Sequence, residues 1–135
     1  MDPLAGKKIL LMIGGSVSAY KTPELARRLR DRGVELRVAL SRHAADFVAP
    51  LALQAVTGQP VRQSLFSPVE EAAMDHIALA RWADALLYAP VSANGLAGLA
   101  QGLASDLPGT IVLAGRAPLF LAPAMNTAMW EHPAT

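Results

Sequence analysis

An amide flanked by methionines is the strongest chemical signal in this chain. Asn126 lies in the segment PAMNTAMW, residues 123–130. Residues 119–122 predict a buried strand that the next proline stops, and Asn126 predicts the start of a helix. Ligands of open α/β sheets bind at this carboxyl end of a strand, where Asn126 and Met125 would suit a flat ligand with a carboxylate or carbonyl group. The alternative is that Asn126 only caps the helix.

A histidine supplies a second candidate for chemistry. His76 follows Asp75 at the start of a helix predicted over residues 77–82. An imidazole in that place can take up a proton near neutral pH, although a structural histidine is the alternative. His43 and His132 are too scattered in the sequence to join it, and no HExxH or HxH spacing occurs. No metal site is therefore predicted.

The third signal is a loop rich in small residues, residues 14–18, between the first predicted strand and the first helix. It contains no G-x-G-x-x-G, no G-K-[ST] and no G-x-S-x-G, which excludes a dinucleotide fingerprint, a P-loop and a nucleophile elbow. Backbone N–H groups of Gly15, Ser16 and Val17 could still approach one phosphate, as on FMN. A tight turn without a ligand is the alternative.

Polar residues also follow the other predicted strands. Ser41 comes after the second strand, and Ser92, Ala93 and Asn94 come after the third. Asp106 begins a later segment. These residues could contact a flavin at the carboxyl edge of a sheet, or they could only cap the helices that follow.

The elements that must position these residues alternate along the chain. The first helix ends at Gly33 and begins either at Thr22 or near Ser18 with a bend at Pro23. Residues 64–73 are polar and are expected to run over the surface. Strands are predicted over residues 8–13, 36–40, 85–89 and 119–122, and helical segments over residues 50–57, 77–82 and 94–103, with residues 106–113 either helical or extended. Such alternation predicts a parallel sheet with helices on both faces.

Composition limits the remaining possibilities. The 135 residues suit one domain, and 53% of them are hydrophobic. A formal net charge of +1 gives no reason to expect nucleic acid or a membrane surface as a partner. The apolar runs are too short to span a bilayer, and no signal peptide is recognised, so a cytoplasmic location is expected. There is no cysteine, which excludes disulfides and thiolate chemistry from this chain.

Taken in order, the motifs resemble those of one enzyme family. They are GSVSAYK at 15–21, MDHI at 74–77, APVSAN at 89–94, SDL at 105–107 and PAMNTAMW at 123–130. This order is similar to that of phosphopantothenoylcysteine decarboxylases, which are flavin-containing cysteine decarboxylases and include the decarboxylase half of bacterial bifunctional coenzyme A biosynthesis proteins. The resemblance implies a flavodoxin-like (Rossmann-like), three-layer α/β domain over residues 1–135.

The resemblance also implies a reaction and roles for residues. FMN oxidises the cysteinyl thiol of 4′-phosphopantothenoylcysteine, CO2 is lost, and reduction gives 4′-phosphopantetheine. His76 matches the active-site base, and Asn126 with Met125 matches the substrate-binding motif. FMN would lie at the interface of a homotrimer or dodecamer. The positions that match the FMN-binding stretches are Gly15, Ser16, Val17, Ser41, Ser92, Ala93, Asn94, Asp106 and Ala124.

One departure from the family pattern matters. The family carries a cysteine on a flap beyond PAMNTAMW, and this chain has none. We therefore expect the domain to lack its C-terminal flap region, which places the final reductive step in doubt. Two other functions stay open: a peptidyl-cysteine decarboxylase, and a flavin-binding regulatory relative without catalysis.

Overall fold

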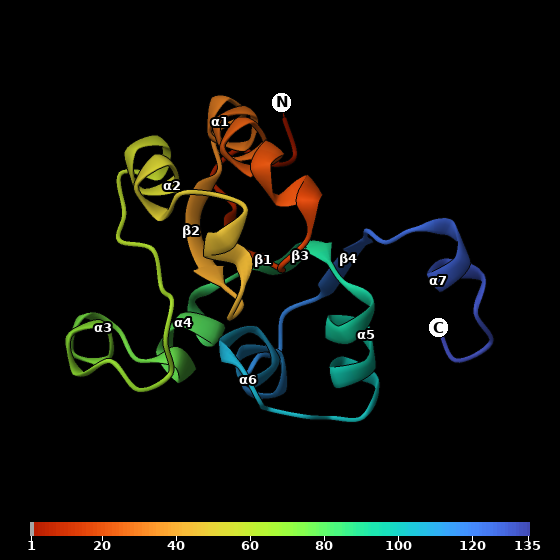
Figure 1. Ribbon diagram of the computed structural model, residues 1–135. Coiled ribbons are helices and arrows are strands. Elements are labelled where there is room, and N and C mark those ends of the chain that lie inside the picture. The colour runs from red at the N-terminus through yellow and green to blue at the C-terminus, as the bar shows by residue number, and fades with distance from the viewer. Residues whose placement is uncertain (1) are drawn as a thin grey trace.

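Four parallel strands form a single sheet in the computed structural model, which describes residues 2–135 (Figure 1). The strands are β1 (Lys8–Ile13), β2 (Glu35–Leu40), β3 (Ala85–Val91) and β4 (Leu119–Pro123). Their order is β2-β1-β3-β4, as in flavodoxin-like sheets. The predicted α/β fold with a parallel sheet is confirmed.

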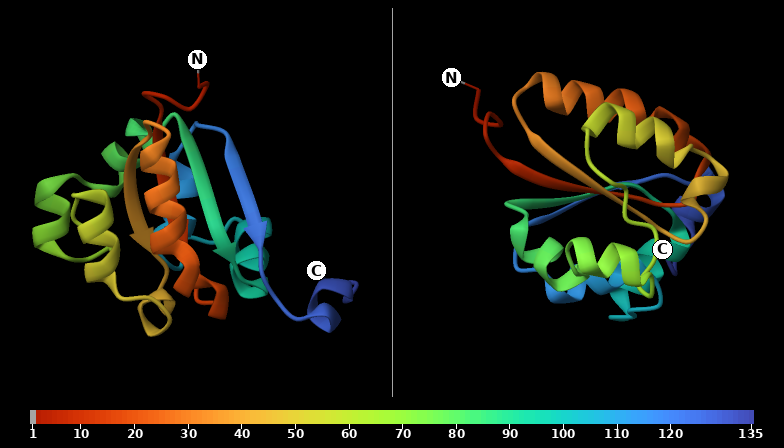
Figure 2. Two further views of the ribbon diagram at one scale, coloured as in Figure 1. Left: turned by 90° about the horizontal axis from the view of Figure 1, so that it is seen from above. Right: turned by 90° about the vertical axis from the view of Figure 1, so that its left-hand side faces the viewer.

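Helices cover both faces of the sheet, which makes three layers (Figure 2). Ile9, Leu11 and Ile13 of β1 pack toward one face with residues of α1 (Thr22–Asp31) and α2 (Pro50–Thr57). Leu10 and Met12 pack toward the other face with residues of α4 (His76–Trp82) and α6 (Leu107–Ala114). Because alternate side chains of a strand point to opposite faces, an unbroken apolar run is what a strand covered on both sides requires.

Most of the remaining elements are short. They are η1 (Val17–Lys21), η2 (Ala44–Asp46), α3 (Pro68–Ala73), α5 (Ala93–Ala100) and α7 (Thr127–Glu131). The two predicted starts of the first helix are both partly right, since a 3-10 turn, η1, leads directly into α1. Residues 64–73 are not only surface loop, because α3 forms there behind an N-cap at Ser67. Residues 106–113 are helical, with Asp106 as the N-cap of α6.

The prediction that the third strand covers only residues 85–89, and so ends before Pro90, is wrong. β3 runs through Pro90 to Val91. A register shift follows Tyr88, and beyond it Val91 pairs with Pro123 of β4. The irregularity accommodates a residue that lacks an N–H group, so the strand continues past the proline.

The prediction that residues 119–122 form a buried strand is half wrong. The strand exists, but every residue of β4 is exposed. Phe120 is 57% and Leu121 is 42% exposed. β4 is the edge strand beside β3, and Figure 1 shows it with α7 at the margin of the molecule, away from the helices over β1 and β2.

In the described part of the chain, no helix combines the length and the apolarity needed to cross a bilayer.

Candidate functional site

The carboxyl ends of β1, β2 and β3 meet at the point where the strand order reverses. In open α/β sheets, ligands bind in the crevice that forms at such a point. A cavity of about 170 Å³, here called the polar pocket, lies at these strand ends. Its lining residues are Gly15, Ser41, Arg42, His43, Tyr88, Ser92, Asn94, Gly95 and Asp106.

Glycines let the loops approach one another at this pocket. The Gly14 N–H donates to the carbonyl of Pro90 at 2.8 Å, and a Cβ on Gly14 would lie only 2.7 Å from that oxygen. A Cβ on Gly15 would lie 3.0 Å from the Cβ of His43. A side chain at Gly14 would push the loop after β1 away from β3, and one at Gly15 would push it away from the loop after β2, so both glycines allow the close approach that forms the pocket.

Two of the predicted cofactor residues cap helices. The Ser92 hydroxyl oxygen accepts from the Gly95 N–H at 3.1 Å, and the Asp106 Oδ1 accepts from the Gly109 N–H at 2.9 Å. The capping alternative is confirmed for both. Capping still leaves both side chains able to bind a ligand, because a capping serine keeps its hydroxyl hydrogen to donate and an aspartate keeps its second oxygen to accept. Both side chains also line the polar pocket.

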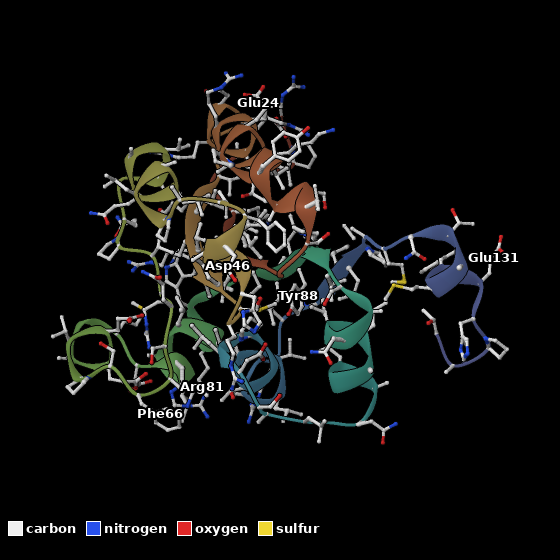
Figure 3. All side chains as sticks on the ribbon, in the orientation of Figure 1. Glu24, Asp46, Phe66, Arg81, Tyr88 and Glu131 are labelled. Atoms are coloured by element: carbon white, nitrogen blue, oxygen red, sulfur yellow. The ribbon has the colours of Figure 1, made fainter. Side chains whose placement is uncertain are left out.

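Sequence reasoning missed Tyr88 and Gly95 as pocket residues. Tyr88, which Figure 3 labels near the middle of the molecule, is 2% exposed. Burial, and then the charge of Asp106, raises the pKa of its phenol far above the ordinary value, so Tyr88 stays protonated. A Cβ on Gly95 would lie 3.3 Å from the Tyr88 hydroxyl. The one sequence feature that could have indicated that Tyr88 lines the pocket is its position near the end of a predicted strand.

Arg42 and His43 line the same pocket directly after Ser41. Their position directly after β2 is the sequence feature that indicates a place in the pocket. Arg42 carries a positive charge beside serine hydroxyls and the Gly15 backbone. Arginine and hydroxyl groups are common donors to phosphate, so this set fits a phosphate group.

A second cavity, of about 330 Å³, lies on the side of the sheet that α1 covers, at the carboxyl ends of β3 and β4. It is called the apolar pocket here, and its lining residues are Ser18, Lys21, Thr22, Leu25, Ala89, Pro90, Ala122, Pro123 and Ala124. The predicted cofactor residues are thus divided. Ala124 lines this pocket, while Ser16, Val17 and Ala93 line neither and lie next in sequence to residues that do.

His76 is the first residue of α4. The N-cap is Asp75, whose Oδ1 accepts from the Ala78 N–H at 2.7 Å. The His76 side chain is 26% exposed, and its Nδ1 lies 3.3 Å from Glu71 Oε1. A half-buried imidazole paired on one nitrogen has the other nitrogen available for proton transfer.

Asn126 is the N-cap of α7, so the capping alternative is confirmed for it too. Its Oδ1 accepts from the Met129 N–H at 2.9 Å. The amide NH2 group is a separate donor and is not used by the cap. Met125, beside it, is partly buried.

The structure does not bring His76 and Asn126 together. α4 and α7 lie on opposite sides of the molecule in the views of Figures 1 and 2. Neither residue lines the polar or the apolar pocket. The chain therefore assembles five predicted cofactor residues in one pocket and separates the two residues predicted to act on a substrate.

The side chains at these strand ends suit a mononucleotide better than a metal ion. Within residues 2–135, no group of three or more His, Cys, Asp or Glu side chains is arranged to hold a metal ion. The polar pocket, with serine hydroxyls, a guanidinium, an amide and a close glycine backbone, fits the phosphate and polyol of a mononucleotide.

The relatives found by comparison with known proteins agree with one another. A family model described as Flavoprotein matches residues 2–135. The chain is 54% identical over 132 residues to the Coenzyme A biosynthesis bifunctional protein CoaBC of Escherichia coli (strain K12), covering 98% of the chain and 32% of that protein. It is 42% identical over 131 residues to a probable phosphopantothenoylcysteine decarboxylase of Streptococcus mutans, covering 96% and 73%. The chain thus spans about a third of the bifunctional relatives.

Solved structures agree in fold. The FMN-dependent cysteine decarboxylase SpaF superposes with a TM-score of 0.87 at 36% identity, over 97% of this chain and 75% of that one. A phosphopantothenoylcysteine (PPC) decarboxylase mutant complexed with pantothenoylaminoethenethiol superposes with a TM-score of 0.77 at 35% identity, over 94% and 71%. The flavodoxin-like fold and the suspected resemblance are confirmed, and the chain belongs to the Flavoprotein family.

Proposed function

We propose that this chain is an FMN-dependent carboxy-lyase domain that binds 4′-phosphopantothenoylcysteine and catalyses its loss of CO2, on the way to 4′-phosphopantetheine in coenzyme A biosynthesis. The observation that carries the proposal is the polar pocket. It gathers Gly15, Ser41, Ser92, Asn94 and Asp106, all expected to bind FMN, at the switch point of a Flavoprotein-family sheet. A relative with 42% identity bears the name of this decarboxylase.

Residues of the polar pocket would hold FMN by its polar end. The Gly15 backbone, the Ser41 hydroxyl and the Arg42 guanidinium suit the phosphate, and Ser92 and Asn94 suit the polyol and the ring edge. When bound, FMN supplies the two-electron oxidation and reduction of the substrate that makes loss of CO2 possible. The protein positions the substrate against it and excludes water.

His76 and Asn126 would act on the substrate. The imidazole of His76 serves as the base that takes a proton from the substrate. The Asn126 NH2 group, which the cap leaves unused, donates to the substrate carboxylate and orients it, with Met125 beside it. These 135 residues hold no cysteine, so the proposal assigns them binding and CO2 loss, and not a thiol-dependent final protonation.

We assign His76 and Asn126 of one active site to two copies of the chain. His76 begins α4 and Asn126 is the N-cap of α7, and these two helices lie on opposite sides of a single copy, whereas a single-copy site would need the two residues side by side. The exposed apolar side chains of β4, beside Asn126, would suit contact with a second copy. This arrangement supports a homotrimer or a dodecamer. We further propose that the domain works in the cytoplasm, since a phosphorylated substrate does not cross a membrane unaided.

A second candidate function is peptidyl-cysteine decarboxylation. The similarity to SpaF keeps it open, because that protein is described as an FMN-dependent cysteine decarboxylase and the description names no particular cysteine-containing substrate. It shares the pocket and differs in substrate. A regulatory relative that binds flavin without catalysis is a third reading, and the paired imidazole of His76 argues against it.

The test begins with binding. The purified chain is titrated with FMN, riboflavin and FAD while flavin fluorescence is followed. We expect FMN to bind at least about tenfold more tightly than riboflavin, because FMN, unlike riboflavin, brings a phosphate to Arg42. Equal affinity for riboflavin would contradict the phosphate assignment, and a preference for FAD would contradict the assignment of a mononucleotide.

Substrate choice follows in the FMN-loaded protein. CO2 release is measured with 4′-phosphopantothenoylcysteine and with a peptide that ends in cysteine. Release from the first alone supports the proposal. Release only from the peptide would replace it with the second candidate, and binding of FMN without any CO2 would favour the regulatory relative.

A further inference from the structure

A buried arginine connects the sheet edge to the segment that carries His76. The Arg62 N–H donates to the Val38 carbonyl at 2.9 Å, and the Leu40 N–H donates to the Arg62 carbonyl at 2.8 Å. These bonds fix the Arg62 backbone against β2. The Arg62 side chain is only 8% exposed, so its charge must be compensated by close partners.

All three nitrogens of the Arg62 guanidinium have partners in the segment before α4. Nε donates to Glu70 Oε1 at 3.2 Å, Nη2 donates to Glu71 Oε1 at 2.6 Å, and Nη1 donates to the carbonyl of Met74. The guanidinium is a rigid fork, so it fixes the direction of each acceptor. Glu71 is thereby held in one place relative to the sheet.

Glu71, held in this way, in turn orients the His76 ring. The same oxygen that accepts from Arg62, Oε1, lies 3.3 Å from His76 Nδ1. Burial acts to raise the pKa of Glu71, but hydrogen bonds from Arg62 and His76 outweigh it and hold the pKa below its ordinary value. Glu71 is thus a carboxylate near neutral pH and can only accept. The hydrogen of a neutral His76 ring must then lie on Nδ1, which leaves Nε2 free to accept a proton.

We propose that Glu71 is a positioning residue for His76: it sets the ring direction and the Nδ1–H tautomer, and Arg62 holds it there. This inference rests on the proposed function, in which His76 is the base. An oriented base with a free Nε2 removes a proton more effectively than a ring that exchanges between tautomers.

The neighbouring glutamate provides a matched control. Glu70 lies on the same helix, α3, and binds the same guanidinium, and it also accepts from the Gln63 N–H at 2.6 Å. Within the described residues, no hydrogen bond or ion pair joins Glu70 to His76. A merely structural role of the cluster would make Glu70→Gln and Glu71→Gln similar, whereas a positioning role makes them differ at His76.

The direct test is nitrogen-15 NMR of the imidazole rings in the FMN-loaded protein, with His76→Asn used to assign the signals. We expect the Nδ1–H tautomer of His76 in the wild type and in Glu70→Gln. In Glu71→Gln, an amide that can donate as well as accept should allow both tautomers. An Nε2–H tautomer in the wild type, or an unchanged tautomer in Glu71→Gln, overturns the inference. The wild-type spectrum decides even if a variant fails to fold.

Turnover adds a second readout. In Glu71→Gln we expect kcat to fall about tenfold or more while KM changes less than about twofold, because orientation of the base is lost and substrate contacts remain. In Glu70→Gln both constants should stay near those of the wild type. Equal losses in the two variants would overturn the inference. Because NMR needs no turnover, an inactive wild type with the expected tautomer would contradict the proposed function and not this inference.

Discussion

An interior strand of the sheet and an edge strand differ in how completely they are covered. At β1, which lies between β2 and β3, the side chains of Leu10, Leu11 and Met12 are fully buried, and the loops beyond β1, β2 and β3 close around a pocket. At β4 every residue is exposed, and the helix that follows, α7, also has only exposed residues. Both regions carry residues with a predicted role in the site.

The difference indicates a division of labour within the proposed site. The groups proposed to bind the cofactor are positioned by the chain's own core, because the strands that carry them pack against the buried core clusters. Asn126 follows the exposed edge strand β4, so the proposal takes its partners in catalysis from another copy.

The largest expected effect is on catalysis. His76→Asn should lower decarboxylation by about 10²–10⁴-fold, because an amide cannot take up the proton that imidazole can. FMN binding should persist, since His76 does not line the polar pocket. Rate assays and flavin fluorescence check both parts. His132→Asn, at an exposed position, is the control and should keep wild-type rates. A His76→Asn protein with normal turnover would remove His76 from the site.

The next prediction compares how much a side chain of β1 and a side chain of β4 contribute to the free energy of unfolding. Leu11→Ala should lower the free energy of unfolding by about 2–5 kcal/mol, because the side chain is fully buried. Leu121→Ala, the same change on β4, should cost less than about 0.5 kcal/mol in the isolated copy. Denaturant unfolding at low protein concentration measures both. A cost at Leu121 as large as that at Leu11 would mean that β4 is covered in solution even in a single copy.

The glycine contacts predict a smaller effect on the cofactor. Gly15→Ala should weaken FMN binding about tenfold, since its Cβ would press on His43 and displace a wall of the pocket. Gly98→Ala is the control, because open space surrounds that position. Fluorescence titration compares the two. FMN affinity unchanged in Gly15→Ala would show that the close approach of the loops is not required for binding.

The smallest expected effect is a pH dependence of stability. The pKa of Glu71 is lowered on folding, since hydrogen bonds from Arg62 and His76 outweigh the opposing effect of burial. Its contribution to stability is therefore complete above its ordinary pKa of about 4.3 and is lost as the pH falls through the lower folded value. Thermal unfolding should show a larger difference between wild type and Glu71→Gln at pH 7 than at pH 3. A difference that does not change with pH would contradict the charged state assigned to Glu71.

Much of the fold was predictable because local patterns and burial agree in the strands around β1. The apolar run over residues 8–13 is enough to predict β1. Gly33, which has a positive φ, is enough to predict the end of the first helix. The exposure of β4 could not be predicted, since the sequence of an apolar strand does not show whether other elements pack against it. The same holds for β3 beyond Pro90, which depends on pairing with β4.

The site was predictable to the extent that it follows strand ends. Gly15, Ser41 and Ser92 come directly after strands, and topology alone brings them together. Tyr88 was missed because it reads as a core aromatic residue. Arg62 and Glu71 were missed because their contact joins residues nine apart through a loop with no periodic pattern.

The most direct test of the two-copy site is complementation between inactive variants. His76→Asn and Asn126→Asp chains are each inactive in the proposal, and they are co-expressed so that they assemble together. If each site takes His76 from one copy and Asn126 from another, random cyclic assembly should restore about a quarter of wild-type decarboxylation. Activity no higher than that of the single variants, in mixed assemblies that form normally and beside an active wild type, would contradict the account.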